Sequence, residues 1–466
     1  MCLAGQRIEE LLQHSLAIVG TGSSMRPSMR SRVLRRQLYC PHHARLVQMF
    51  FSTFCLTLLV AYSCRLSTVK YGQVANPICL YAPMFLLQTV IAPLIFYKMG
   101  LLDDFGNAAV GTVWLSTLYF FGVAGAFLIR PSPFRRLFTY ILPKQDPPGI
   151  GTGALLLFFL TFFSLMVASG VGTLWLTSPR TAYQEHRAGV GVLWSLSEAF
   201  LVMSFSGFLI CQRSRSRIFV YCLAFAFLGY FLGAKGFMLI YFVLAVLYIQ
   251  HRLKPLSMTT LGLAAVGVIL GQGAMQLLQG TAQNYSDTIL YFDYFSNTAL
   301  FLHHFNEFGY TWGTTMLGDL WYYVPRALYP AKPFVYGGIS IMEHFSPGQA
   351  ALGATAGTLS WAEAYLDFGV SGVLAEGILT GFIVKAAYEI FRKSNKCIYF
   401  LFFAQVGLLF ATGVFANAPL PIFILWISAV FALVKFAHQG LVYATSFSLP
   451  KNKHIAPSSD AYTISE

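Results

Sequence analysis

The sequence predicts an all-α membrane protein: a polytopic bundle of about 11 (10–12) transmembrane helices with one long periplasmic loop that contains short amphipathic helices. Hydrophobic residues make up 56% of the chain and charged residues 11%, whereas soluble domains average about 25% charged residues. The mean hydropathy is +0.61. The apolar residues form runs of about 20, the length that crosses a bilayer as a helix, without the alternation of a β-barrel strand. A water-soluble fold is therefore excluded.

The apolar runs divide the chain into two groups of spans. The first group, helices 1–8, occupies residues 49–277, and the second, helices 9–11, occupies residues 360–443, followed by a cytoplasmic tail at 444–466. Aromatic residues make up 16% of the chain, which suits helices that meet lipid with Phe and the headgroups with Tyr and Trp. The predicted spans lie near 46–64, 77–97, 107–129, 149–171, 190–211, 218–233, 236–250, 256–277, 360–390, 397–416 and 420–443.

Basic clusters between the spans set the predicted orientation. The net charge of +13 would suggest nucleic acid in a soluble protein, but here the cations alternate with apolar runs, so no nucleic-acid partner is expected. Cytoplasmic loops are enriched in Lys and Arg, and three clusters agree on the cytoplasmic side. They are Arg213, Arg215 and Arg217; His251, Arg252 and Lys254; and Arg392, Lys393 and Lys396. The alternation then places the loop 172–189, the turn at Lys235 and the segment 278–359 outside.

The N-terminal arm, residues 1–48, conflicts with this orientation. The same alternation places its arginines on the outer face, where basic segments are rarely translocated. Met49 directly precedes the apolar run FFSTFCLTLLVAY. Either a span is miscounted, or residues 1–48 do not belong to the native protein and translation starts at Met49. Mass spectrometry of the native protein distinguishes the two, because peptides upstream of Met49 contradict the second.

The segment 278–359 is much longer than ordinary connections, and loops of that length are usually functional or disordered. It contains aromatic stretches such as YFDYFSNTALFLHHF and WYYVPRALYP, a composition opposite to that of disordered chains. We therefore expect short amphipathic helices over the outer mouth of the bundle, with their aromatic faces at the membrane interface.

Several basic residues fall on the outer side, against the usual trend. Arg180 and Arg187 lie in the loop before the fifth span, Lys235 in a Gly-Ala-Lys-Gly turn, and Arg326 and Lys332 in the long loop. One interpretation is a site for phosphate or pyrophosphate, in which Arg supplies a planar fork and Lys a point charge. The alternative is a set of interface anchors that extend to water. The tight turn at Lys235 and the Pro-bracketed segment at Arg326 favour the binding site for these two.

Two residues are candidates for proton transfer. Glu363 lies where the long loop returns to the membrane, and an ionisable group at that depth is a functional candidate, unless it only pairs with a loop cation. Asp367 follows one helical turn later and could share a pocket with it. His344 is the second candidate, because histidine side chains ordinarily titrate near neutral pH. The alternative is that His344 is a solvated loop residue without a role in proton transfer. The sequence contains no nucleotide phosphate loop and no metal-ligand spacing, so no metal or other cofactor is expected.

Four short stretches resemble the Wzy-type O-antigen (oligosaccharide repeat unit) polymerases, GT-C-like membrane glycosyltransferases related to the O-antigen ligases. The stretches are residues 65–77, GAKG at 233–236, VPRALYPAKP at 324–333 and AEAYLDFGVSG at 362–372. The resemblance covers most of the chain from about Met49. Members more often carry Arg where this chain has Lys235, Gly where it has Ala362, and Asn where it has Asp367. Lysine keeps the charge but not the fork of arginine.

The resemblance implies polymerisation of undecaprenyl-pyrophosphate-linked oligosaccharides at the periplasmic face of the bacterial inner membrane, without metal or nucleotide sugar. It implies that cations neutralise the departing diphosphate and that Glu363 or His344 takes a proton from the attacking sugar hydroxyl. Its expected partners are the lipid-linked substrate, the lipid bilayer and a polysaccharide chain-length regulator, with which members commonly work. The implied diphosphate ligands are Lys235, Arg326, Arg187 and Lys332.

Three other functions stay open at this stage. An O-antigen ligase, which transfers the glycan to lipid A core, would share the architecture. A lipid-linked oligosaccharide transporter or flippase would predict internal repeats and polar residues through many spans, and the clustering of cations on one face favours an enzyme instead. A membrane-bound acyltransferase would need a histidine within a span, whereas His303 and His304 lie in the long loop.

Overall fold

The computed structural model contains only helices as regular elements in the part that it describes. That part comprises residues 29–100, 102, 105–129, 132–143, 146, 149–186, 190–233, 237–253, 293–318, 338–345, 357–412 and 432–440, together with scattered residues within 255–274, 320–335, 347–348 and at 429. The all-helical class predicted from the sequence is confirmed for these residues.

The helices follow the apolar runs of the sequence closely. Most predicted spans in the described part coincide with a helix to within a few residues, because a long apolar run can satisfy its backbone in lipid only as a helix. The predicted span 46–64 is the exception, since its helix extends from Met29 to Tyr71. The helices are α2 (Met29–Tyr71), α3 (Pro77–Leu86), the π-helical turn η1 (Leu87–Ile91), α4 (Ala92–Lys98), α5 (Asn107–Leu128), α6 (Phe134–Ile141), α7 (Ile150–Ala168), α8 (Gly172–Thr177), α9 (Pro179–His186), α10 (Gly191–Ile210), α11 (Arg215–Tyr230), α12 (Phe237–Arg252), α15 (Tyr294–His303), α16 (Phe305–Phe308), α17 (Thr314–Gly318), α18 (Ile339–Phe345), α20 (Ala362–Lys393) and α21 (Cys397–Thr412).

Six helical stretches among the described residues are long and apolar enough to cross a membrane. The helices α11, α12 and α21 coincide with three further predicted spans but have 16 residues each. The predicted spans 256–277 and 420–443 are only partly covered by the described residues. The six stretches are Val47–Tyr71, Pro77–Lys98, Asn107–Leu128, Ile150–Ala168, Gly191–Ile210 and Ala362–Lys393.

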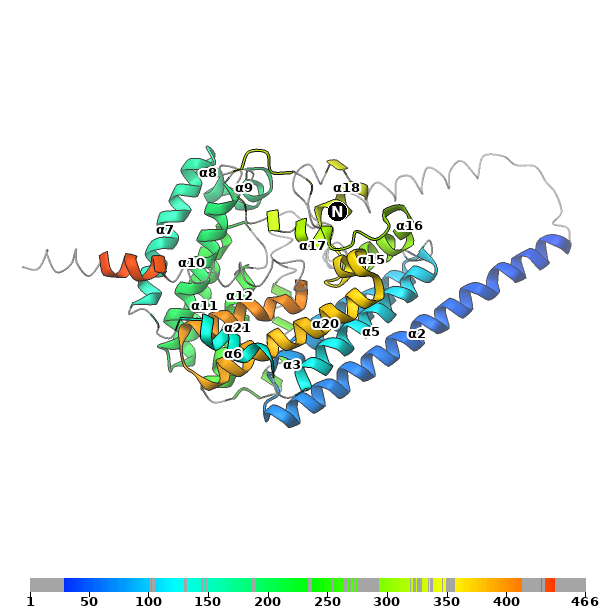
Figure 1. The fold of residues 1–466 in the computed structure, drawn as a ribbon, viewed down its shortest axis with the longest axis horizontal. Coiled ribbons are helices and arrows are strands. Elements are labelled where there is room, and N and C mark those ends of the chain that lie inside the picture. Colours follow the sequence, from blue (N-terminus) through cyan, green and yellow to red (C-terminus); the bar gives the residue numbers. More distant parts are fainter. Residues whose placement is uncertain are drawn as a thin grey trace, which may run out of the picture.

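Close helix packing in the bundle depends on glycine. A Cβ atom at Gly377 of α20 would lie 2.4 Å from the backbone oxygen of Tyr119 in α5, and one at Gly381 would lie 2.4 Å from that of Val123. Small residues let helix backbones approach in this way where the surrounding lipid offers no hydrophobic driving force. Figure 1 shows the result, with α2, α5 and α20 running side by side and α7 and α10 forming a second group.

The helix α20 is kinked near its start. Gly369 has φ +64° and ψ −146°, a conformation that is accessible to glycine and strained for other residues. After the kink, a Cβ at Gly372 would lie 2.1 Å from the backbone oxygen of Ala364. The kink therefore separates a short segment that carries Glu363 and Asp367 from the long membrane part of the helix.

The bundle has two distinct ends. We call the end formed by α8, α9, α15–α18 and the start of α20 the loop end; it lies along the upper edge of Figure 1. The opposite end, where α10, α12 and α20 terminate, carries the basic clusters and is called the basic end. The loop end has a small apolar core of its own, in which Phe301, Ile341, Ala362 and Leu366 are buried together.

Candidate functional site

Glu363 lies in the first turn of α20 at the loop end. Its neighbours Ala362 and Ala364 are buried, and the fully buried Trp361 donates its indole N–H to the Ser116 hydroxyl of α5 at 3.2 Å. One carboxylate oxygen, Oε1, lies against Gly338, where a Cβ atom would come within 2.3 Å of it. The carboxylate is thus held between the bundle and the residue that directly precedes α18.

Asp367 has a structural setting that differs from the expected pocket shared with Glu363. Its buried carboxylate accepts the backbone N–H groups of Gly313 at 3.1 Å, Thr315 at 3.2 Å and Met316 at 3.0 Å, and also the Thr311 hydroxyl. A carboxylate is favoured at the first N–H groups of a helix such as α17. Asp367 therefore fastens the turn 311–316 to the segment that carries Glu363.

His344 is held by a carboxylate that the sequence analysis did not single out. Its Nε2 lies 2.8 Å from Oε2 of Glu307, whose Oε1 lies 2.7 Å from Nδ1 of His304. These two hydrogen bonds hold the pKa of Glu307 below its usual value. His304 and Glu307 are three residues apart, a spacing that predicts contact on a helix, whereas Glu307 and His344 are 37 positions apart and no local pattern links them. A histidine oriented by a carboxylate is a common arrangement for a general base.

Lys332 is the one predicted diphosphate ligand among the described residues. Its side chain is only 9% exposed, which argues against an interface anchor reaching into water. The backbone N–H of Lys332 donates to the Tyr329 carbonyl at 3.1 Å, and the Tyr329 ring stacks on Trp321 with 5.4 Å between centroids. Tyr329 and Lys332 therefore belong to one turn that packs against Trp321. The other three predicted ligands, Lys235, Arg326 and Arg187, lie outside the described residues.

The two loops that carry Arg187 and Lys235 nevertheless meet in the structure. Arg180 of α9 donates through Nη1 to the Gly233 carbonyl at 3.3 Å, and its guanidinium lies 5.3 Å from the centre of the Tyr183 ring. Gly233 has φ +70°, and a Cβ there would lie 2.2 Å from the backbone oxygen of Pro179. The first glycine of the Gly-Ala-Lys-Gly turn is thus required for this contact. Arg180 is a cation of this site that the sequence analysis had placed in the loop without assigning it a role.

Among the described residues, the loop end therefore carries fixed carboxylates, an oriented histidine and the basic residues Arg180 and Lys332. Such a set can take a proton from a hydroxyl and stabilise an anionic leaving group. Within the described residues, no three His, Cys, Asp or Glu side chains gather in a metal-binding arrangement.

Comparisons with known proteins give one consistent result. The chain is a distant homologue of proteins named O-antigen polymerase from Salmonella typhimurium strain LT2 and from Salmonella typhi. It is 24% identical to each over 423 residues, which cover 87% of this chain and 97% of the relative. No family model matches the chain, and no solved structure matches it. The resemblance predicted from the short motifs is confirmed as distant homology.

Proposed function

We propose that this protein polymerises undecaprenyl-pyrophosphate-linked oligosaccharide repeat units into O-antigen or a related surface polysaccharide. The observation that carries the proposal is the extent of the homology, since the alignment spans 97% of each O-antigen polymerase and is not limited to a few apolar helices. In this proposal the bundle has about eleven spans in the bacterial inner membrane, with the loop end at the periplasmic face.

The proposed reaction is a glycosyl transfer that uses a lipid diphosphate donor and needs no metal. A hydroxyl of the acceptor sugar attacks the anomeric carbon of the donor chain, the new C–O bond forms, and the bond to the diphosphate oxygen breaks. Undecaprenyl diphosphate leaves with the electron pair. Lys235, Arg326, Arg187 and Lys332 stabilise the charge that develops on it, as preorganised cations do in a water-poor site.

We assign the role of base to Glu363, with His344 as the alternative. The base takes the proton of the attacking hydroxyl as the C–O bond forms. Support for Glu363 comes from its position between the bundle and the loop, where Trp361 and Gly338 restrict it. Support for His344 comes from its hydrogen bond with Glu307. A chain-length regulator is proposed as a further partner.

The test is the surface polysaccharide profile of cells that lack the protein and are complemented with variants at matched membrane abundance. Glu363→Gln and Arg326→Ala should both leave lipid A core that carries a single repeat unit, whereas Glu343→Gln, which removes an exposed carboxylate next to His344, should restore the full ladder. His344→Ala separates the two candidate bases, because only the true base gives the complete loss.

Two results would contradict the proposal. Bare core together with accumulated lipid-linked polymer would identify a ligase instead. An unchanged ladder in the deletion strain would remove the polymerase assignment and favour a lipid-linked oligosaccharide transporter.

A further inference from the structure

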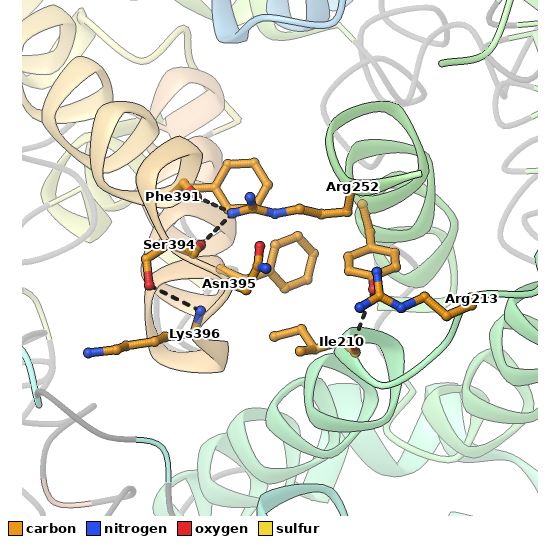
Figure 2. A pocket seen from close by; sticks show the side chains of 9 residues that line it. Ile210, Arg213, Arg252, Phe391, Ser394, Asn395 and Lys396 are labelled. Carbon is orange, nitrogen blue, oxygen red and sulfur yellow. Dashed lines mark hydrogen bonds between the residues drawn. The ribbon is translucent and has the colours of Figure 1, made fainter. Parts of the chain in front are cut away.

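The basic end contains a cavity of about 160 Å³, far more than the roughly 10–15 Å³ that one water molecule needs. It lies where α10 and α12 end and where the turn 394–396 joins α20 to α21. Figure 2 shows Arg252, from the end of α12, and Arg213, from the segment that follows α10, extending toward the side of the cavity where Asn395 lies. Three basic clusters that are far apart in the sequence each contribute one residue, because Lys396 is also part of the wall.

The charges around this cavity have one sign. Of the nine described residues that line it, three are basic and none is acidic. In Figure 2 the ammonium group of Lys396 extends away from the other two cations, and it lies 5.4 Å from the centre of the Tyr399 ring. The two guanidinium groups therefore define the polar side of the cavity. Like charges held close together raise the energy of an empty site and favour an anion within it.

Backbone contacts hold Arg252 and the turn that precedes Arg213. Arg252 donates through Nη2 to the carbonyls of Phe391 and Ser394 and lies 4.8 Å from the centre of the Phe391 ring. A guanidinium group carries donors on two further nitrogens. The Tyr248 hydroxyl lies 3.0 Å from the carbonyl oxygen of Ile210 and 3.1 Å from that of Gln212, which fixes the turn that leads to Arg213. The site is thus preorganised for a planar, bidentate contact with phosphate.

Part of the remaining wall is apolar, and this favours one kind of phosphate. Ile210, Phe391 and Phe400 line the cavity beside the arginines. Two residues after Arg213, α11 begins, and its surface exposes large apolar side chains such as Phe219 and Val220, which suit contact with acyl chains. A cavity that joins cations to apolar surface at the end of membrane helices fits an amphiphile better than a free ion.

We propose that this cavity binds the phosphate headgroup of an anionic glycerophospholipid from the cytoplasmic leaflet, with Arg213 and Arg252 as its ligands. Basic pockets between membrane helices on the cytoplasmic side are established sites for such headgroups. The orientation is the one predicted from the basic clusters, and the proposal does not depend on polymerase activity. Its function is to anchor the junction of α10, α12 and α20 to the membrane surface.

Native mass spectrometry of the full chain in detergent tests the proposal, with added phosphatidylglycerol, cardiolipin or phosphatidylethanolamine. The two anionic lipids should be retained preferentially. Arg213→Gln should lower their retention about fivefold, the effect expected for one cation near an anionic headgroup. Arg217→Gln makes the same charge change at an exposed residue outside the cavity and should retain lipid like the wild type. Arg252→Gln is a second variant.

Three outcomes would overturn the proposal. Equal retention of anionic and zwitterionic lipid would show no headgroup selectivity. An equal loss in Arg213→Gln and Arg217→Gln would show only diffuse surface attraction. Binding of inorganic phosphate at millimolar concentration without any lipid retention would assign the cavity to a free anion. Because Arg213 is exposed, its variant should fold, so the test remains valid if Arg252→Gln does not accumulate.

Discussion

At both the loop end and the basic end, a charged side chain caps a helix, but the charge is negative at the loop end and positive at the basic end. At the loop end, the carboxylate of Asp367 accepts backbone N–H groups at the start of α17; at the basic end, Arg252 donates to backbone carbonyls at the end of α20. Negative groups are favoured at helix N-termini and positive groups at helix C-termini. Capping therefore accounts for these hydrogen bonds of Asp367 and Arg252, whereas the proposed ligand contacts involve Glu363, Arg213 and the remaining donors of Arg252.

This difference separates contacts that hold the helices together at each end from contacts that are proposed to bind a substrate or a lipid there. Variants of the capping residues should change stability first, whereas variants beside Glu363 should change activity at unchanged abundance. Four predictions test that separation.

The largest effect is expected for Asp367→Ala, which removes the acceptor of three backbone N–H groups and one hydroxyl in a buried turn. Buried donors without an acceptor cost about 1–3 kcal/mol each, so we expect a loss of roughly 3 kcal/mol or more. Asp367→Asn keeps the Oδ1 acceptor and should lose about 1 kcal/mol. Thermal unfolding of the purified protein measures both. Equal loss in the two variants would contradict the capping role.

A second prediction concerns the contact between Gly338 and Glu363. In Gly338→Ala the new methyl group would lie 2.3 Å from Oε1, so the carboxylate must move. A displacement of about 1 Å from productive geometry can cost roughly 100-fold in rate, and we expect a loss of that order in polysaccharide synthesis at normal membrane abundance. The matched control is Gly348→Ala, which meets no atom within 4 Å and should synthesise polymer normally. Full activity of Gly338→Ala would remove Glu363 from the site.

The two ends also differ in how much of them the sequence predicted. The span 190–211 was predicted almost to the residue as Gly191–Ile210, because hydropathy is a local property of the chain. The link between Glu307 and His344 was not predicted, since it joins residues 37 positions apart, and such contacts depend on tertiary packing. For the same reason, the basic clusters in the sequence predicted the orientation of the helices in the membrane, but they did not predict that Arg213 and Arg252 line one cavity. The roles of the predicted diphosphate ligands stay predictions.

The third prediction addresses the kink at Gly369, which the sequence did not indicate because glycine is also common within membrane helices. Gly369→Ala places a side chain at φ +64° and within 3.0 Å of the Tyr310 ring. At ψ −146° this positive-φ conformation is almost confined to glycine, and another residue there costs about 1–3 kcal/mol. We expect a lower unfolding temperature and partial loss of polymer, whereas Gly125→Ala in α5, which meets no atom within 4 Å, should resemble the wild type. If Gly369→Ala were fully stable, α20 would have to be straight at this point.

The smallest effect is expected for Glu307, whose pKa is lowered by its hydrogen bonds with His304 and His344. A carboxyl group with a lowered pKa in the folded state stabilises the protein above its unfolded pKa, and this stabilisation is lost as the pH falls through the folded value. The unfolding temperature of the wild type should therefore exceed that of Glu307→Gln above the ordinary value of 4.5 and approach it below that pH. Because all three side chains are partly exposed, salt should reduce the difference. A difference that persisted unchanged in acid would mean that Glu307 supports α18 by packing, and His344 would then lose the carboxylate that orients it.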